Sequence, residues 1–499
     1  MQRPGNEREP MRMLMRQLIA ALALFMPIVA FAQSTTNNDD SCDIGTYPAA
    51  TLLLPYFEVD TAQRGVDTFF TVTNVSGLPQ IAHVTIWTDW SFPVLDFSLF
   101  LTGYDVQSIS MYDVVVNGVI APSLFNITSG TSSDTVPGSL SFGNNGGNPQ
   151  IDITNCGGGK LPRFLSPPVR AALQSALVSG VYNAGGFSSG CGTTNHVGSS
   201  ASTHRTAATA VGYVTIDVTS KCTTTLPTDP SYYVNEILFD NVLTGDFAIL
   251  DKTPGSNYAG GSPLIHIRAV PEGGAAGATP PNGQSTKLPY TFYGRFINGQ
   301  TITGVPIPPH FDRRQPLPST FAARFIQAGP ISFNTDFLMW REGTAGPVTC
   351  ANAVSNSALN VPELVRFDEH ENPNTFDFGV LHPVPPPVIT TPATQRTSTA
   401  GATFPPFNSP AGDIAGWMYF NLDSGVSDQT INTAAHPAFT KRPSQNWVVI
   451  SMTGAGSTAG LFGNAFDAMS LGNGCSPRVA TSQANGGSAP IGPAPNTNP

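Results

Sequence analysis

The stretch IAHVTIWTDWSFPVLDFSLF, residues 81–100, decides the fold class of this chain. Alternate residues of a strand share one face, so Ala82, Val84 and Ile86 lie together on one side of the segment. Trp87 lies on the opposite side. One apolar face and one mixed face are typical of a strand in a sheet that covers a core, and we predict such a strand here.

The mixed face of this strand is the first candidate for a binding site. The preceding segment TFFTVTNV, residues 68–75, is also strand-like, and we expect the two to form a hairpin across the turn at 75–79. His83 and Trp87, with Phe69 beside them, would then offer an aromatic platform with polar groups, as sugar-binding surfaces do. The alternative, which we favour, is that a loop or another domain covers Trp87 and satisfies its indole N–H.

Similar strand-like runs recur along the whole chain, rich in Val, Ile, Thr and aromatic residues and bounded by turn-forming residues. They cover residues 68–75, 82–90, 94–101, 211–219, 246–251, 264–270, 290–297, 321–326, 336–341, 414–422 and 447–453. The clearest helix is SPPVRAALQSALV, residues 166–178, with Ser166 as the expected N-cap and Gly180 after its end. A parallel α/β fold would need a helix between successive strands. We therefore predict a mainly β, antiparallel fold.

Glycine and proline divide the chain into two predicted β-sandwich-like domains of the immunoglobulin or jelly-roll kind, with long Gly/Pro-rich loops and one short helical insert. The segment PEGGAAGATPPNGQSTK, residues 271–287, has few residues that can bury apolar surface and is the expected linker. The Pro-rich segment 382–412 is either a second linker or a surface loop. The predicted divisions are a signal peptide at 1–32, an N-terminal domain at 42–270 with its helical insert near 160–190, a C-terminal domain at 288–475 and a disordered tail at 476–499.

The N-terminus has the features of a secretory signal peptide. Arg12 and Arg16 precede an apolar run at 18–31, which ends in small residues before Gln33. The run is shorter than the roughly 20 residues that cross a bilayer, which disfavours the alternative of an uncleaved anchor. No later segment offers a membrane span, and we expect a protein of the periplasm, the cell surface or the exterior.

Charge and cysteine content limit the kinds of partner and of metal or redox site that we expect for this chain. The chain carries 23 Lys and Arg against 33 Asp and Glu, a net charge of -10 without a basic block, which excludes nucleic acid. The cysteines all follow the signal segment and form no CxxC pair, so three disulfides are expected rather than a zinc or redox site. Gly-rich turns favour a pair between Cys156 and Cys191. The six disulfide candidates are Cys42, Cys156, Cys191, Cys222, Cys350 and Cys475.

Two short motifs suggest chemistry. Residues 186–190, GFSSG, match the G-x-S-x-G pattern of serine hydrolases, with His196 and His204 close behind. That motif needs a strand before the serine and a helix after it, whereas a helix and glycines precede this one, so we interpret it as a chance match. For the sequence DRR at 312–314, a structural ion pair with loop carbonyls or carboxylates is favoured over anion recognition.

The densest set of potential metal ligands is Asp368, Glu369, His370 and Glu371. Calcium or a transition metal is the ion that such a set would bind. Adjacent residues cannot all point at one ion and the spacing of a calcium loop is missing, so a solvated loop is the alternative. A carbohydrate hydrolase would instead need two carboxylates about 5 to 10 Å apart. The candidates for such a pair are Asp336, Glu342, Asp368, Glu369 and Glu371.

Six segments carry a resemblance to known sequences. They are TLLLPYFEVD (51–60), TFFTVTNVS (68–76), HVTIWTDWSFPVLDF (83–97), LTGYDV (101–106), GYVTIDV (212–218) and DRRQPLPSTFAARF (312–325). They resemble segments of a family of uncharacterised, exported, β-rich bacterial proteins. The resemblance implies export and a β-rich fold. It implies no enzymatic activity, and it identifies no catalytic residues.

These observations favour a secreted or cell-envelope protein with a structural, adhesive or binding role and without enzymatic activity. One alternative is a secreted hydrolase that acts on carbohydrate through a carboxylate pair. The other is a calcium- or ligand-binding module built on residues 368–371, which is the one case in which a cofactor, calcium, is expected. The partners predicted for the favoured role are components of the envelope or of the extracellular surface.

Overall fold

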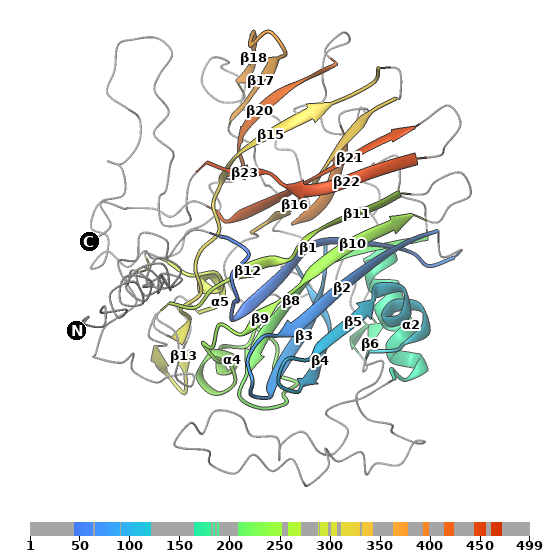
Figure 1. Cartoon of the computed structure of the whole chain (residues 1–499). Coiled ribbons are helices and arrows are strands. Elements are labelled where there is room, and N and C mark those ends of the chain that lie inside the picture. The colour runs from blue at the N-terminus through green and yellow to red at the C-terminus, as the bar shows by residue number, and fades with distance from the viewer. Residues whose placement is uncertain are drawn as a thin grey trace, which may run out of the picture. The chain divides into compact units, whose positions relative to one another are not determined.

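The computed structural model describes residues 44–62, 65–89, 91–120, 164–180, 183–184, 187–188, 208–251, 258–270, 288, 290–297, 301–306, 311–329, 332–342, 363–377, 393–398, 414–423, 444–455 and 461–471. Its elements are mainly strands in antiparallel sheets, as the sequence predicts (Figure 1). All described residues belong to one compact unit, Ser41–Thr497. The predicted signal peptide at 1–32, linker at 271–287 and tail at 476–499 lie outside the described residues, and the division into two domains stays a prediction.

The stretch 81–100 forms two neighbouring strands of a five-stranded sheet with the order β12-β1-β8-β3-β4 (Figure 1). Its strands are β1 (Thr51–Asp60), β3 (Gln80–Thr88), β4 (Pro93–Leu101), β8 (Thr209–Thr219) and β12 (Ile265–Ile267). The sequence predicts all of these except β1, which contains Pro55. The structure accommodates this proline at a shift in register between Leu54 and Phe57, where a strand tolerates a residue without an N–H donor.

The predicted hairpin between residues 68–75 and 82–90 is wrong. β2 (Val66–Asn74) belongs to a second sheet with the order β11-β10-β2-β5, whereas β3 belongs to the first. The connection at 75–79 therefore carries the chain from one sheet to the other. The other strands of the second sheet are β5 (Val106–Ser110), β10 (Asp246–Asp251) and β11 (Tyr258–Pro263), and β9 (Leu243–Thr244) also pairs with β2.

Apolar side chains from these two sheets share one core. In β2, Phe70 and Val72 are buried and alternate with the more exposed Phe69 and Thr71. Phe70, Val72 and Val84 of β3 belong to the same core cluster. Each such side chain contributes roughly 1.5–3 kcal/mol on burial. The arrangement is consistent with the predicted β-sandwich.

Two further sheets come from the C-terminal half of the chain, with the orders β18-β17-β20-β15-β23 and β19-β16-β21-β22 (Figure 1). The strands of the first are β15 (Thr320–Ile326), β17 (Glu363–Asp368), β18 (Pro373–Asp377), β20 (Ala415–Asn421) and β23 (Met469–Ser470). Those of the second are β16 (Asn334–Arg341), β19 (Thr394–Ser398), β21 (Asn446–Ala455) and β22 (Leu461–Asp467). β19 comes from the Pro-rich segment 382–412, part of which is thus a strand of a sheet. Two short pairs complete the described strands, β6 (Asn183–Ala184) with β7 (Phe187–Ser188) and β13 (Thr301–Ile302) with β14 (Val305–Pro306).

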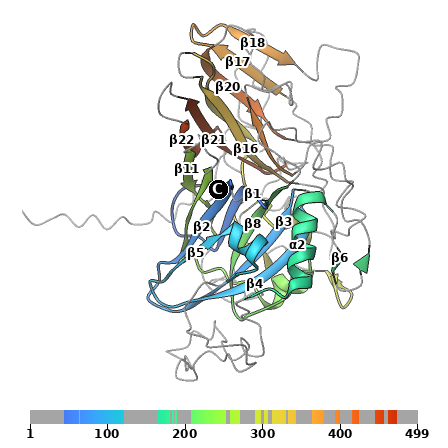
Figure 2. The same cartoon turned by 90° about the vertical axis from the view of Figure 1, so that its right-hand side faces the viewer.

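The predicted helix at 166–178 is confirmed as α2 (Pro167–Ser179). Ser166 occupies the N-cap position, although its side chain makes no capping hydrogen bond, and Gly180 ends the helix with a φ of 74°. Only glycine adopts such a left-handed conformation without steric cost. The helix packs against β8 and β4 (Figure 2), and its buried residues are Ala172, Leu173, Ala176 and Leu177.

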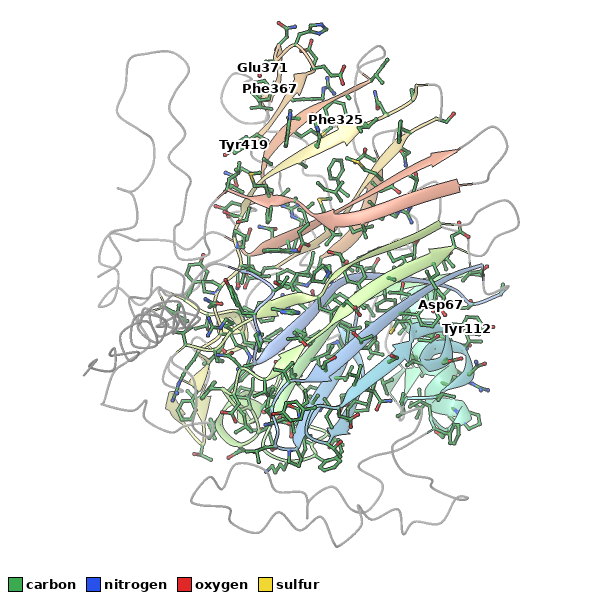
Figure 3. The ribbon with its side chains drawn as sticks, in the orientation of Figure 1. Asp67, Tyr112, Phe325, Phe367, Glu371 and Tyr419 are labelled. Atoms are coloured by element: carbon green, nitrogen blue, oxygen red, sulfur yellow. The ribbon has the colours of Figure 1, made fainter. Side chains whose placement is uncertain are left out.

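Three short helical segments were not predicted. The strand expected at 290–297 is wrong, because this segment ends in α5 (Gly294–Ile297). The other two are α4 (Pro230–Asn235) and the π-helical turn η1 (Asp113–Asn117). Buried Asp67 fixes the entry to η1, since its carboxylate accepts hydrogen bonds from the Ser110 hydroxyl and the Tyr112 N–H, both at 2.9 Å (Figure 3).

Candidate functional site

Three neighbouring strands of the first sheet place a serine, a histidine and an aspartate side by side. His83 on β3 is the cross-strand partner of Ser98 on β4 and of Asp217 on β8. These are the residue types of a serine-hydrolase triad, in which the histidine is hydrogen-bonded to both neighbours. Within the part of the chain that the structure describes, neither ring nitrogen of His83 nor the Ser98 hydroxyl has a hydrogen-bond partner, and all three residues are buried. Ser98, His83 and Asp217 therefore lack the hydrogen bonds of a catalytic triad.

Asp217 is instead the centre of a buried hydrogen-bonded cluster. Its Oδ2 accepts hydrogen bonds from the hydroxyls of Tyr232 at 2.9 Å and Tyr293 at 2.8 Å, and its Oδ1 accepts one from Thr51. The Nε of Arg314 lies 3.4 Å from Oδ1 and forms an ion pair. The carboxylate is thus fully engaged by structural partners.

Arg314 connects this cluster to the backbone. Its Nη2 donates to the carbonyls of Ala50 at 3.3 Å and Leu238 at 3.1 Å, and its Nη1 lies 3.6 Å from Oδ1 of Asp312. Asp312 in turn accepts a hydrogen bond from the N–H of Tyr293 at 2.8 Å. The structural role predicted for the motif at 312–314 is confirmed for Arg314.

Burial controls the protonation of this cluster. It raises the pKa of Tyr232 and Tyr293 well above the ordinary value, and the negative charge of Asp217 raises both further. Burial also raises the pKa of Asp312, an effect that the guanidinium of Arg314 opposes. The phenols therefore stay protonated and act as donors to Asp217. Removing one charge from such a buried set leaves its partner unpaired, which is strongly destabilising.

Trp87 is fully buried in the structure, and no face of its ring is open to solvent. Its indole N–H donates to the hydroxyl of Thr215 at 2.9 Å. The ring stacks on Tyr213, at 5.5 Å between centroids, and on Phe296, at 6.0 Å. Phe296 belongs to α5, so the segment mispredicted as a strand provides the cover. The structure thus has the covered arrangement that the sequence favours over a sugar platform.

His83, Thr85 and Ser98 are buried polar side chains without a side-chain hydrogen-bond partner among the described residues, and half-buried Asp96 lies beside them. Asp96 on β4 is the cross-strand partner of Thr85, which follows His83 on the same face of β3. Among the described residues, the hydroxyls of Thr85 and Ser98 and the Oδ2 of Asp96 have no hydrogen-bond partner. Burial lowers the pKa of His83 to about 3 and raises that of Asp96 to about 7. Between these values both side chains are neutral in the folded protein.

A second buried ion cluster joins strands of different sheets. Arg396 on β19 binds Glu58 on β1 through Nη1, and its Nε donates to Oδ2 of Asp336 on β16 at 2.8 Å. Tyr56 adds a hydrogen bond from its hydroxyl to Glu58 at 2.8 Å. The three charged side chains are between 0 and 6% exposed. Asp336, a candidate for a hydrolase pair, is therefore held in a structural ion cluster.

Glu342, the next hydrolase candidate, is engaged in the same way. Its carboxylate accepts hydrogen bonds from the backbone N–H and the side-chain amide of Gln445, at 3.0 and 3.1 Å. Asp336 lies near the start of β16 and Glu342 directly follows its last residue, so a rise of six residues separates them by about 20 Å. That exceeds the about 5 to 10 Å between the carboxylates of a glycosidase. The two residues do not form a catalytic pair.

The predicted metal ligands form the turn between β17 and β18. Oδ1 of Asp368 accepts hydrogen bonds from the N–H groups of His370 and Asn372, both at 2.8 Å, and the hydrogen bonds from Asn372 lower the pKa of Asp368. Glu369, His370 and Glu371 are exposed, and Glu371 lies beside the hairpin strands with a φ of 63° (Figure 3). In the described ranges, no group of three or more His, Cys, Asp or Glu side chains is placed to hold a metal ion. Asp368 thus has a structural role in this turn.

The remaining motifs lie largely outside the described residues. Ser188 of the G-x-S-x-G match is on the two-residue strand β7, which pairs with β6, and its two candidate histidines are not described. Of the six cysteines, Cys222 is described and is buried. The predicted disulfide pairing therefore stays a prediction.

A groove of about 490 Å³ lies on the second sheet, and we call it the outer groove. Its lining residues are Phe69, Phe70, Thr71, Ser108, Asp246, Phe247, Ala248, Gly261, Ser262 and Pro263. Phe69 and Thr71 are on the partly exposed face of β2, opposite the core. Asp246 on β10 is exposed, and its Oδ1 accepts a hydrogen bond from the Thr71 hydroxyl at 2.5 Å. The N–H of Asp246 donates to the same hydroxyl at 3.2 Å, so two hydrogen bonds fix this pair.

Sequence reasoning missed the outer groove. It placed Phe69 on one face with His83 and Trp87, whereas the structure puts Phe69 in a different sheet. The available signal was the alternation in β2, where Phe69 and Thr71 lie on one face and Phe70 on the other. The partners from β10 and β11 lie nearly 200 residues away and have no local signature.

Comparisons with known proteins do not suggest a function for this chain, so a function is argued from the geometry of its own residues. No family model, curated protein or solved structure matches the chain. Within the described ranges, none of the helices is both long and apolar enough to cross a membrane. The outer groove is therefore assessed from its own side chains.

Proposed function

We propose that this chain is an exported protein of the cell envelope or the exterior that acts by binding, without enzymatic activity, and that the outer groove is its binding site. The groove's volume of about 490 Å³ falls within the roughly 300–1,000 Å³ of small-ligand sites. Export is supported by the signal-like segment at 1–32 and by six cysteines beyond it. An immunoglobulin-like or jelly-roll strand order for its sheets is part of the same proposal.

One observation carries the choice of binding over hydrolysis. Among the described residues that line the outer groove, Asp246 is the one ionisable side chain. A glycosidase needs two carboxylates, one as acid and one as base or nucleophile. A single carboxylate beside a hydroxyl can accept hydrogen bonds from a ligand but cannot fill both catalytic roles.

The positions of the other acidic residues support the same choice. Asp336 is paired with Arg396, Glu342 is bonded to Gln445, and Asp368 fixes a hairpin turn. Asp336 and Glu342 are buried acids that are retained because they are paired or hydrogen-bonded, and Asp368 stabilises an exposed turn.

Two measurements test the proposal. Cells that express the full chain are fractionated beside cells that express a chain without residues 1–32, and the full chain alone is expected in the envelope or the medium. The exported protein is then incubated with neutral and acidic polysaccharides, and new reducing ends are measured over time. A cytoplasmic location of the full chain, or reducing ends released in proportion to the protein added, would overturn the proposal.

A further inference from the structure

We infer that the ligand of the outer groove is a neutral carbohydrate, recognised as a short run of sugar residues. The inference rests on the proposed binding function and adds the chemical class of the ligand. The groove combines an aromatic ring, a fixed pair of hydrogen-bonding side chains and a floor of small residues, and each of these fits one property of a sugar.

The aromatic component is Phe69. It lies on the partly exposed face of β2, directly across from Ala248 on β10. A phenyl ring packs against the apolar C–H face of a pyranose and contributes apolar contact at little entropic cost, since the side chain has few rotatable bonds. Because Phe69 is held in an interior strand, its ring is presented by a rigid element.

The polar component is the pair of Thr71 and Asp246. Their two mutual hydrogen bonds, at 2.5 and 3.2 Å, fix both side chains before any ligand arrives. Oδ2 of Asp246 takes part in no hydrogen bond within the described part of the chain. An ionised carboxylate oxygen accepts up to two hydrogen bonds, as the hydroxyls of a sugar require. Exposed Ser108, opposite Thr71 on β5, adds a third polar position to the same row.

The floor of the groove consists of small side chains. Ala248 is the cross-strand partner of Gly261, and Asp246 is the partner of Pro263 on the same strand pair. A Cβ at position 261 would lie 3.6 Å from the Cβ of Ala248, so a larger side chain there would project over this floor. The missing side-chain volume is what leaves room for a flat ligand across β10 and β11.

Charge and strand pairing decide between ligand classes. The one charged side chain among the described lining residues is negative, and the chain has a net charge of -10; both disfavour phosphates, uronates and other anions. A peptide that binds as an added strand needs a free sheet edge. β2 and β10, which carry Phe69, Thr71 and Asp246, are interior strands with partners on both sides, and the edges of this sheet are β5 and β11. A strand added at either edge would lie beside these three side chains and not across them. Recognition is left to side chains, which suits a polyhydroxylated ligand.

The test measures binding of the full exported chain to defined glycans. An array that carries neutral glucans, mannans, xylans and chitin-derived oligosaccharides beside the acidic polymers pectate and heparin identifies the probe, and calorimetric titration with the best soluble oligosaccharide gives its affinity. Three variants alter the groove in different ways: Phe69→Ala removes the ring, Asp246→Asn removes the charge, and Ala248→Trp fills the floor. Each is expected to lower the affinity about tenfold or more.

Two variants serve as matched controls. Trp417→Ala removes an aromatic that is 43% exposed on a different sheet, and Glu369→Gln removes an exposed carboxylate from the β17–β18 turn. Both are expected to leave the affinity within about twofold of the wild type. Unfolding midpoints of all five variants separate a lost site from a lost fold, and Ala248→Trp keeps the test decisive if Phe69→Ala proves unstable.

The outcomes separate this inference from the proposed function. Binding to a neutral glycan that the three groove variants weaken and the two controls retain supports the inference. Binding to none of the neutral probes, binding to acidic polymers alone, or equal affinity in wild type and groove variants overturns it. Reducing ends measured in the same incubations report on the proposed function, because their release would overturn that function whether or not the groove binds sugar.

Discussion

Changing His83 tests the group of buried, unpartnered polar side chains most sharply. His83 faces Ser98 and Asp96 from β4 and Asp217 from β8, and its ring centroid lies 5.6 Å from that of Tyr232 on α4. His83→Phe keeps a ring at this position and removes two nitrogens that have no partner. Replacing such polar atoms by apolar ones is neutral or stabilising near neutral pH.

The pH dependence follows from two shifts of opposite sign. Folding lowers the pKa of His83 from 6.5 to about 3, so its contribution to stability is complete above pH 6.5 and is lost as the pH falls toward 3. Folding raises the pKa of Asp96 from 3.8 to about 7. The free-energy cost of holding its ionised carboxylate in the fold is therefore complete above pH 7, and it is relieved as the pH falls toward 3.8. At about 1.4 kcal/mol per pKa unit, the full effects are about 5 and about 4 kcal/mol. The two nearly cancel between pH 4 and 6.5.

The variants should therefore diverge on acidification. Between pH 6.5 and 4.5, His83→Phe should gain about 2 kcal/mol of unfolding free energy relative to the wild type, because the Asp96 effect remains alone. Asp96→Asn should lose about 2 kcal/mol relative to the wild type over the same interval, because the His83 effect remains alone. Urea unfolding at pH 6.5, 5.5 and 4.5 measures both, and the shared contribution of all other carboxylates drops out of the comparison.

Parallel behaviour of the three proteins would refute this reasoning. If wild type, His83→Phe and Asp96→Asn change equally in unfolding free energy between pH 6.5 and 4.5, the pKa values of His83 and Asp96 are not shifted as described. The double variant His83→Phe with Asp96→Asn is the control, and it should follow the wild type to within about 1 kcal/mol.

Two further predictions concern stability. Arg396→Met leaves Glu58 and Asp336 buried without their guanidinium, and it should lower the unfolding free energy in urea by about 3–5 kcal/mol. Gly212→Ala places a methyl group far inside van der Waals contact with the carbonyl oxygen of Trp87, and it should lower the stability measured by calorimetry by about 1–3 kcal/mol.

Exposed positions provide the controls for these two variants. Arg324→Met removes an exposed guanidinium that lies 5.1 Å from the ring of Trp417, and it should change the unfolding free energy by less than about 1 kcal/mol. An equal loss for Arg324→Met and Arg396→Met would contradict the assigned role of the buried cluster. Gly261→Ala, whose Cβ would lie 3.1 Å from the nearest atom, should be milder than Gly212→Ala.

The strands with strong local patterns could be predicted from the sequence. The bounds of β10 agree with the predicted 246–251, and α2 agrees within one residue at each end. Both have clear periodicity and turn-forming neighbours. The strand predicted at 290–297 is wrong because the aromatic residues of this segment cover Trp87 and Asp217. Composition alone does not distinguish aromatic residues of a strand from aromatic residues that cover a core.

The assembly of the sheets could not be predicted in the same way. Alternation in residues 68–75 correctly separates the faces of β2 but does not reveal that β2 and β3 belong to different sheets. The partners of buried charges are equally remote, since Glu58 binds an arginine at position 396. The hydrolase candidates Asp336 and Glu342 are buried against partners that are distant in sequence, Arg396 and Gln445. Their structural role could therefore be recognised only in the folded chain.

The ion cluster of Glu58, Asp336 and Arg396 has a consequence for the order of synthesis. Arg396 follows Glu58 by 338 residues in the chain. At 5–20 residues per second, translation needs about 20–70 s to reach this arginine after Glu58 is made. Until then β1 has an acid without its arginine on a surface that will later be buried. β1 is thus made early and is among the last described strands to gain all its partners, and folding should be slow and sensitive to C-terminal truncation.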